Sequence, residues 1–248
     1  MSAWLLIAFS LFCAGAVKGI FGMGLPAVSL GLLSLAMPTV EAAALIVVPT
    51  LATNLWQFMM GPQKALLVRR FATLLVGVVV GTMLGVGFLT GTHTALVSLA
   101  LGGVLILYAV VGLRAFTWRV PVEREFWASP VVGMVTGLIN GATGVSVMPL
   151  VPYLNSVGLA RDALIQAMGL VFIVAMVSLA TCLAWTGHFE LGSARASTLA
   201  LLPVFAGMYL GQVIRVRLHA DDFRKWFFVG LLALGGYSAL RALVQVTS

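Results

Sequence analysis

The chain reads GAVKGIFG at residues 15–22 and GLINGATG at residues 137–144, two stretches that lie 122 positions apart. Three glycines coincide when the stretches are aligned, and both interrupt an apolar run. Further along, Glu41-Ala42 aligns with Asp162-Ala163 at an offset of 121. Self-similarity that persists at one offset indicates an internal repeat. The sequence therefore predicts a chain built from two related halves.

Composition identifies the solvent that surrounds both halves. Of the 248 residues, 61% are apolar and only 8% are charged, and the mean hydropathy is +1.12. A water-soluble domain is roughly a quarter charged, because polar side chains must cover its surface. This composition excludes a soluble enzyme, a disordered chain and a disulfide-stapled secreted domain. It predicts an all-α polytopic membrane protein.

Ten apolar runs divide equally between the halves, residues 1–120 and 121–248, which we expect to form one membrane domain. Seven runs have 18 to 23 residues, close to the ~20 that cross a bilayer, but one of them, residues 20–37, contains Pro26 and follows Gly19. The others are short or interrupted by Gly and Pro, so each half is predicted to be a Gly-broken helical hairpin followed by three membrane-spanning helices. Pro49 and Pro203 are expected to kink two of the long runs. The runs are residues 3–17, 20–37, 42–60, 71–90, 95–113, 127–139, 145–159, 163–185, 197–214 and 226–244.

Positive charge is concentrated in one set of loops. The chain has 14 Lys and Arg against 7 Asp and Glu, a net charge of +7. Eleven of the cations fall in loops that can share one side of the membrane, which leaves Arg195, Arg241 and the break residue Lys18. Lys and Arg in short loops mark the cytoplasmic side, so this basic balance requires no nucleic-acid partner. Both termini are predicted outside, in the periplasm, for a protein of the bacterial inner membrane.

The charge pattern also inverts between the halves. The loop at residues 61–70 is basic, whereas its equivalent at residues 186–196 carries only Arg195. The loop at residues 91–94 is uncharged, whereas its equivalent at residues 215–225 is strongly basic. Such a pattern predicts two inverted-topology repeats, an arrangement found in many secondary transporters.

The two glycine-rich breaks are the candidate substrate site. Non-helical backbone at membrane depth is tolerated only where it lines a cavity or packs inside protein. We expect residues 18–24 and 140–146 to form hairpin tips that meet near the midplane, with the following helices presenting their N-termini to an anion. The alternative is that the glycines serve close helix packing and that Lys18 lies at a membrane face. The predicted substrate-binding residues are Lys18, Gly19, Gly22, Gly24, Asn54, Gln57, Asn140, Gly141, Thr143, Gly144 and Ser146.

Asn54 and Gln57 enter this set through a polar face on the run at residues 42–60. Thr50, Thr53, Asn54 and Gln57 recur at helical spacing. A polar stripe among apolar residues faces either a cavity or a neighbouring helix, and both alternatives stay open here.

Catalytic and cofactor sites are not indicated. No span contains a His that could pair with Ser146, and the chain has no His-Glu-x-x-His sequence. We therefore expect no enzyme activity, no catalytic residues, no metal site and no cofactor.

The break at residues 15–24 resembles the glycine-rich signature that opens each half of the sulfite exporter TauE/SafE family, and residues 137–146 resemble it too. The segment TNLWQ at residues 53–57 is similar to a helix segment of many members. The family usually has three consecutive glycines after the break, where this chain has Gly24-Leu25-Pro26 and Ser146-Val147-Met148. The resemblance implies transport of sulfur-containing anions such as sulfite or organosulfonates, and of small carboxylates in some members, across the inner membrane.

Together these features predict a secondary transporter, an exporter, that carries a small oxyanion by alternating access around a midplane site. The alternatives are an anion channel and a carrier of small carboxylates. The expected partners are a small anionic substrate and the lipid bilayer, without nucleic acid, and a homodimer is compatible with the sequence.

Overall fold

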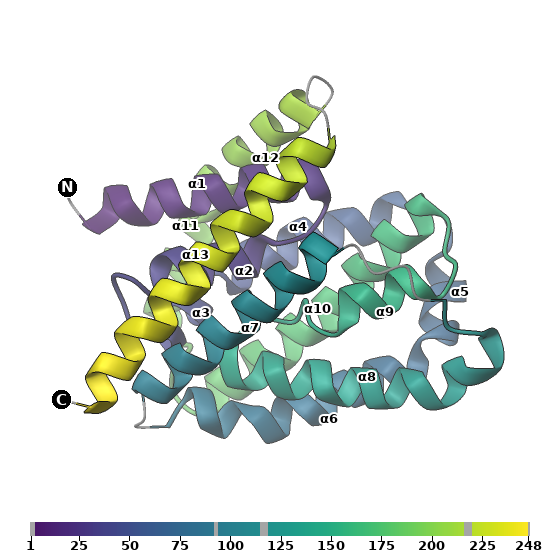
Figure 1. Cartoon of the computed structure of the whole chain (residues 1–248), viewed down its shortest axis with the longest axis horizontal. Coiled ribbons are helices and arrows are strands. Elements are labelled where there is room, and N and C mark those ends of the chain that lie inside the picture. The colour runs from purple at the N-terminus through teal and green to yellow at the C-terminus, as the bar shows by residue number, and fades with distance from the viewer. Residues whose placement is uncertain (1–2, 92–93, 115–118, 216–219, 248) are drawn as a thin grey trace.

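The computed structural model describes residues 3–91, 94–114, 119–215 and 220–247, and these ranges contain helices and connecting turns but no β-strand (Figure 1). The helices are α1 (Ala3–Phe21), α2 (Leu25–Leu33), α3 (Thr39–Leu45), α4 (Val47–Met60), α5 (Lys64–Arg70), α6 (Ala72–Leu89), α7 (Thr94–Arg114), α8 (Val122–Thr143), α9 (Leu150–Ser156), α10 (Arg161–Trp185), α11 (Leu191–Leu199), α12 (Leu201–Arg215) and α13 (Ala220–Thr247). The same order of elements occurs in both halves. In chain order, the first half has α1, α2, α3–α4, α5–α6 and α7, and the second half has α8, α9, α10, α11–α12 and α13.

Several helices are long and apolar enough to cross a membrane. The described residues contain six such segments, and a seventh if the bent pair α3–α4 is one span. The predicted class of all-α, polytopic membrane protein is confirmed. The six segments are Trp4–Phe21, Ala72–Leu89, Thr94–Arg114, Arg161–Trp185, Gly192–Ile214 and Arg224–Val244.

The first helix of each half is longer than the sequence predicted. The run at residues 3–17 was expected to be too short to span, but α1 has 19 residues and continues through Lys18. The run at residues 127–139 was also expected to be short, but α8 has 22 residues and begins at Val122. The prediction was wrong because an apolar run stops at the first charged residue, whereas a helix continues as long as its backbone hydrogen bonds do.

The predicted kink at Pro49 lies one turn before the proline, and the helix around Pro203 is interrupted at the equivalent place. Helices α3 and α4 meet at Ile46 with a bend of 46°, three residues before Pro49. Helices α11 and α12 meet at Ala200, three residues before Pro203. Proline has no N–H to bond the carbonyl four residues earlier, so the helix opens in the preceding turn.

The first helix of each half packs on the other half. Helix α1 packs along α12, and α8 packs along α6; α7 pairs with α13 and α4 pairs with α10. Figure 1 shows α6 and α8 side by side along the lower edge, and α7 and α13 crossing the face diagonally. The two halves are therefore interleaved, and each supplies the packing surface for the other half's opening helix.

Glycines allow the backbones to approach closely in two of these contacts, α6 with α8 and α1 with α12. On α6 and α8, glycines recur every fourth residue, and a Cβ added at Gly81 would overlap the carbonyl oxygen of Met134. A Cβ at Gly137 would likewise overlap the carbonyl oxygen of Val78. Such small-residue stripes let two backbones approach within the bilayer, where dispersion replaces the hydrophobic effect between helices. The glycines involved are Gly77, Gly81, Gly85, Gly133, Gly137 and Gly141, with Gly15, Gly19, Gly207 and Gly211 on α1 and α12.

Equivalent helices of the two halves run in opposite directions where they touch. Helix α7 meets α13 antiparallel, with Gly102 beside Ala239 and Gly112 beside Phe228. Helix α4 meets α10 antiparallel as well, because residues near the end of α4 bond residues near the start of α10. Gln57 Nε2 donates to the carbonyl oxygen of Ile165 at 2.6 Å.

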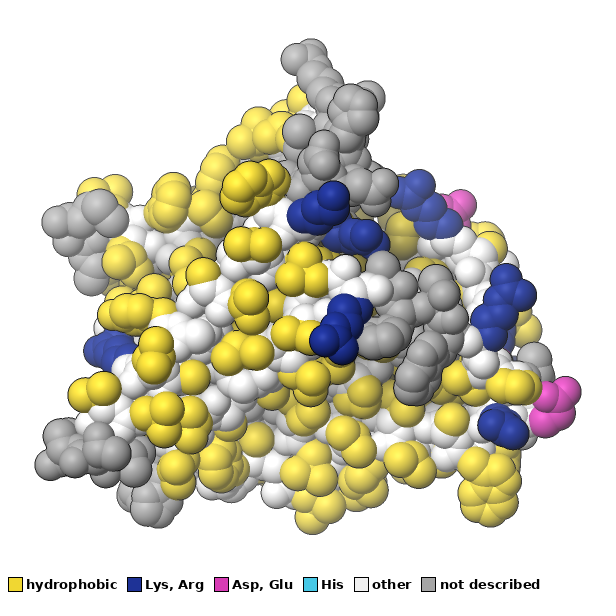
Figure 2. Space-filling view, in the orientation of Figure 1, with side chains coloured by type: hydrophobic (Ala, Val, Ile, Leu, Met, Phe, Trp, Pro, Cys, Tyr) yellow, Lys and Arg dark blue, Asp and Glu magenta, His cyan; other side chains and the backbone are white. Residues whose placement is uncertain are grey.

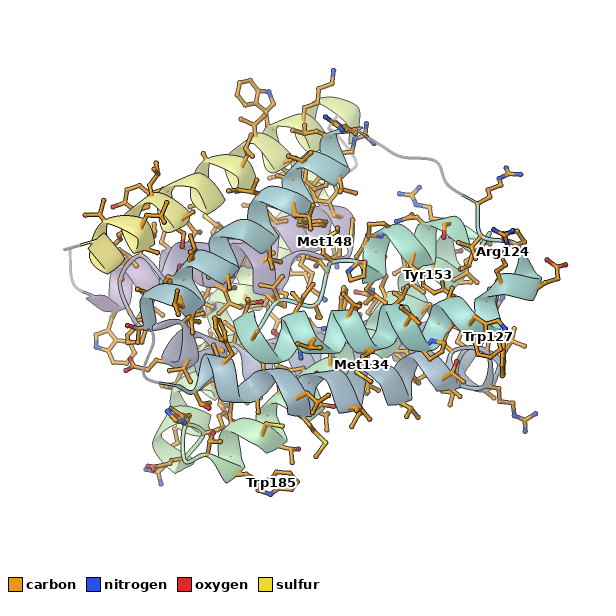
Figure 3. All side chains as sticks on the ribbon, turned by 60° about the horizontal axis from the view of Figure 1, so that its bottom comes forward. Arg124, Trp127, Met134, Met148, Tyr153 and Trp185 are labelled. Carbon is orange, nitrogen blue, oxygen red and sulfur yellow. The ribbon has the colours of Figure 1, made fainter. Side chains whose placement is uncertain are left out.

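One ion pair joins the end of α5, the start of α8 and the end of α9. Arg70, at the end of α5, donates to both carboxylate oxygens of Glu125 on α8, at 3.0 and 2.6 Å, and to the carbonyl oxygen of Val157 after α9 at 3.0 Å. This pairing raises the pKa of Arg70 above its usual value. Beside it, the hydroxyls of Ser129 and Tyr153 bond at 2.7 Å, and Figure 3 shows Tyr153 between α9 and α8. Most Lys and Arg side chains visible in Figure 2 lie in its right half, over the otherwise apolar face.

Candidate functional site

The first break contains two glycines in the left-handed conformation. Helix α1 ends at Phe21, and Gly22 and Gly24 have φ angles of 76° and 94°, a region that side chains disfavour. The N–H of Gly22 donates to the carbonyl oxygen of Lys18 at 2.7 Å, which closes the last turn of α1. Helix α2 begins directly afterwards at Leu25 and is almost wholly buried. The break therefore holds Lys18 in the last turn of α1, inside the protein.

Lys18 is buried and has one hydrogen-bond partner among the residues that the structure describes. Its Nζ donates to Oδ1 of Asn54 on α4 at 2.5 Å, and the residue is 4% exposed. In the part of the chain that the structure describes, no Asp or Glu lies within salt-bridge distance of it. A buried ammonium is stable only when hydrogen bonds or a counter-charge replace its hydration. One amide oxygen leaves two of its three donors unused, which suits an anion.

Two more polar groups on α4 lack partners. Asn54 is fully buried, and because its Oδ1 accepts from Lys18, its Nδ2 remains without a hydrogen bond. The buried hydroxyl of Thr50 also has none, and it lies one helical turn away. Buried polar groups are usually paired with protein or with water, so the unpaired Nδ2 of Asn54 beside the buried Lys18 makes this place a candidate ligand site. Thr50 was recognised as part of the polar face but was not among the predicted binding residues.

Asn140 occupies the position in the second half that Lys18 occupies in the first. Its Nδ2 donates to the carbonyl oxygen of Ala175 on α10 at 3.0 Å and to Oγ1 of Thr82 on α6 at 3.2 Å. Ala175 is 121 positions after Asn54, so the two buried side chains contact equivalent places on equivalent helices. Oδ1 of Asn140 remains without a partner. Thr82 was missed because only the packing of α6 on α8 brings it here.

The second break differs from the first in length. Helix α8 ends at Thr143, Gly144 has a φ of 77°, and the backbone stays non-helical through Pro149, so that α9 begins at Leu150. Figure 3 shows Met148 within this segment. The expectation that both helices begin just after their tips holds for α2 but is wrong for α9. Since α9 has only seven residues, its N-terminus adds little to a binding site.

Thr143 and Ser146 have different surroundings in this break. The hydroxyl of Thr143 bonds back to the carbonyl oxygen of Ile139 at 2.8 Å, which is the ordinary behaviour of Thr in membrane helices. Ser146 is 4% exposed, within the non-helical segment. The structure thus brings Ser146 inside the protein with the break, while the hydroxyl of Thr143 is used locally.

Three predicted site residues serve helix contacts. Gly19 lies inside α1, where a Cβ would overlap the carbonyl oxygen of Met208 on α12. Gly141 lies inside α8, where a Cβ would overlap the carbonyl oxygen of Thr82. Gln57 bonds α10, as described above. For these residues the structure matches the packing alternatives, because each faces a neighbouring helix.

Gly144 also touches the first half, which gives a testable expectation. A Cβ there would lie 2.8 Å from Cδ1 of Leu30 on α2, and φ is positive as well. Gly144→Ala is expected to lower the free energy of unfolding by about 2–4 kcal/mol, of which ~1–2 kcal/mol reflects the left-handed backbone. The measurement is denaturant unfolding in detergent micelles.

Gly158→Ala is the matched control for Gly144→Ala. Gly158 has a φ of 69°, but a Cβ there meets nothing within 4 Å. Its replacement isolates the backbone penalty, so the difference between the variants measures the contact with Leu30. Equal losses in the two variants would contradict a close contact between the second break and α2.

The predicted polar residues Lys18, Asn54 and Asn140 are buried among packed helices. Two surface cavities, of about 260 and 380 Å³, are lined by other residues. Within the described ranges, no three His, Cys, Asp or Glu residues are placed to hold a metal ion. Two buried polar contacts make up the candidate site: Lys18 with Asn54, and Asn140 with Thr82 and Ala175.

Comparison with known families gives one match. The model of the sulfite exporter TauE/SafE family matches residues 7–238, nearly the full 248 residues. No curated protein and no solved structure matches the chain. The match confirms the family that the glycine-rich breaks resembled, and a transporter family is not an enzyme family. The chain therefore belongs to the sulfite exporter TauE/SafE family, a family of membrane transporters for sulfite-type anions.

Proposed function

We propose that this protein exports a small sulfur-containing oxyanion, such as sulfite or an organosulfonate, across the bacterial inner membrane by alternating access. The substrate is held by Lys18 and Asn54, with Asn140 and the backbone of the breaks at Gly22, Gly24, Gly144 and Ser146 closing around it. Both termini face the periplasm in this proposal.

The observation that carries the proposal is the buried Lys18 without a carboxylate partner among the described residues. Its unused N–H groups and the unpaired Nδ2 of Asn54 are all donors. An oxyanion offers several acceptor oxygens and a negative charge, so it satisfies these groups together. A cationic or apolar substrate would leave them unpaired.

The interleaved halves support alternating access. Equivalent helices run antiparallel, as expected for repeats related by a two-fold axis in the membrane plane. Because α1 packs on α12 and α8 packs on α6, each break moves with a helix of the opposite half. Rocking of these two units would change which side of the membrane reaches Lys18.

The membrane potential supports export. An inside-negative potential of 100 mV contributes ~2.3 kcal/mol per negative charge moved outward. A carrier without a coupled ion therefore drives efflux of an anion, whereas uptake would require a coupled cation.

Purified protein in proteoliposomes tests the proposal. Vesicles are loaded with labelled sulfite, an organosulfonate or a small carboxylate, and efflux is followed with and without a potential. We expect saturable efflux and counterflow for the sulfur oxyanions, accelerated by a potential that is negative inside. Ohmic conductance in a planar bilayer would instead identify a channel, and flux of carboxylates alone would overturn the substrate assignment.

A further inference from the structure

A polar cavity lies at the end of the molecule opposite α5, the helix that carries Arg70 (Figure 1). The chain segment after α2, the start of α7 and the last part of α13 enclose about 260 Å³. The charge pattern predicts that these three segments lie outside, together with the loop at residues 186–196. The polar residues that line the cavity are Ser34, Thr94, Ser98, Ser238 and Arg241.

Arg241 is fixed at the wall of this cavity. Its Nη1 donates to the carbonyl oxygen of Leu35 at 2.7 Å, which joins α13 to the segment after α2. A guanidinium has five N–H donors, and this bond uses one of them. In the described part of the chain, no carboxylate lies within salt-bridge distance of Arg241. The cavity lining contains no Asp or Glu either.

The other groups around the cavity do not oppose an anion. The carbonyl oxygens at the end of α2 are already used, because the N–H groups of residues 34–37 donate to Leu30, Leu32 and Leu33. Ser238 donates to the carbonyl oxygen of Ser98 at 3.2 Å. The hydroxyls of Thr94 and Ser98 remain as donors, in the first turns of α7, where the helix dipole is positive.

We propose that this cavity is an outer anion site, in which the exported oxyanion is held by Arg241, Thr94 and Ser98 after it leaves the buried site at Lys18. The inference rests on the proposed function, since it assigns the exit side of the same carrier. A planar guanidinium binds an oxyanion through two parallel hydrogen bonds, and hydroxyls complete its shell. The volume also admits water, which a released anion needs to regain its hydration.

Counterflow from the outer side tests the outer site. In oriented proteoliposomes, Arg241→Gln is expected to raise about tenfold the external sulfite concentration that gives half-maximal exchange. The maximal efflux of internal sulfite is expected to stay within twofold. Arg195→Gln, at the other outside cation, is the matched control and is expected to leave both quantities unchanged. Indistinguishable behaviour of the two variants in an active transporter would overturn the outer site.

A second variant separates loss of binding from loss of folding. Ser98→Asp places a carboxylate in the cavity, which repels an anion, and keeps the backbone carbonyl of Ser98 to which Ser238 donates. We expect external exchange to fall at least tenfold. The protein should still elute as a monodisperse particle, because no packing contact is removed. Wild-type external exchange in this variant would contradict the proposal.

Binding in detergent separates this inference from the proposed function. Sulfite is expected to raise the melting temperature of Lys18→Met protein, and to do so less when Arg241→Gln is added. If the wild-type protein transports no anion, the proposed function is wrong. The outer site is then judged only by whether Arg241→Gln reduces the rise in melting temperature that sulfite causes in Lys18→Met protein. Native mass spectrometry tests whether the site instead binds the phosphate group of a lipid. Phospholipid retained only when Arg241 is present, with no response to sulfite, would overturn the site.

Discussion

Lys18→Met is expected to lower sulfite efflux about 100-fold, which corresponds to about 2.7 kcal/mol of lost substrate or transition-state stabilisation. Removing one partner of a buried, charge-assisted contact typically costs 2–5 kcal/mol. Methionine keeps most of the volume of the side chain and removes its charge and donors. The measurement is initial efflux from proteoliposomes at matched protein density.

Lys18→Met should change the free energy of unfolding much less than it changes the rate of efflux. Methionine ends the burial of an ammonium without a carboxylate partner, which is stabilising, but it leaves Oδ1 of Asn54 unpaired, at about 1–3 kcal/mol. We therefore expect the free energy of unfolding to change by less than ~2 kcal/mol. A variant that unfolds in step with its loss of flux would indicate a structural lysine instead.

Lys64→Met is the matched control for Lys18→Met. Lys64 begins α5 and is exposed, outside the buried core. Its replacement removes the same charge from the chain and should leave efflux within twofold. Full efflux from Lys18→Met vesicles would remove Lys18 from the substrate site.

Gly81→Ala is expected to lower the free energy of unfolding by about 2–3 kcal/mol, because a Cβ there overlaps the carbonyl oxygen of Met134 and lies close to the backbone of Gly137. This overlap is relieved only if the backbones of α6 and α8 move apart along their whole contact. That separation would also displace Thr82, which bonds Asn140. The measurement is denaturant unfolding in detergent, with efflux measured in parallel.

Gly87→Ala lies on the same helix and supplies the comparison. A Cβ at Gly87 meets nothing within 4 Å, so the substitution should stabilise α6 by about 0.5–1 kcal/mol through the helix propensity of alanine. The two variants change the same atoms six residues apart. Similar stabilities for both would contradict the close α6–α8 contact.

The sequence predicts the class of fold and the location of both breaks, because these depend on local properties. Composition identifies the membrane, and Gly22, Gly24 and Gly144 have the positive φ angles that make glycine necessary at a turn. The order of elements in the two halves follows from the repeat at offsets of 121 and 122. Helix ends depend on hydrogen bonding as well as hydropathy, so the lengths of α1 and α8 were underestimated.

The roles of individual site residues depended on the partners of each helix. Gly19 and Gly22 are three residues apart in one glycine-rich stretch, yet one packs on α12 and the other turns the chain. Nothing local separates these roles. Asn54 and Gln57 lie on the same polar side of α4, but Gln57 donates a hydrogen bond to α10, whereas Asn54 accepts one from Lys18. The sequence offered both alternatives, and tertiary packing selected between them.

The exchange of opening helices has a consequence for biosynthesis. Gly81 meets Met134 only 53 positions later, so α6 and α8 can pair while the ribosome is still making the second half. Gly15 meets Val204, which is 189 positions further along the chain. Because synthesis proceeds from the N-terminus, α1 is made long before α12, the helix along which it packs. Until α12 is made, α1 can contact α2 and bond Asn54 on α4, but its face with Gly15 and Gly19 has no partner helix, so we expect a chain that ends before α12 to leave this glycine face unpacked.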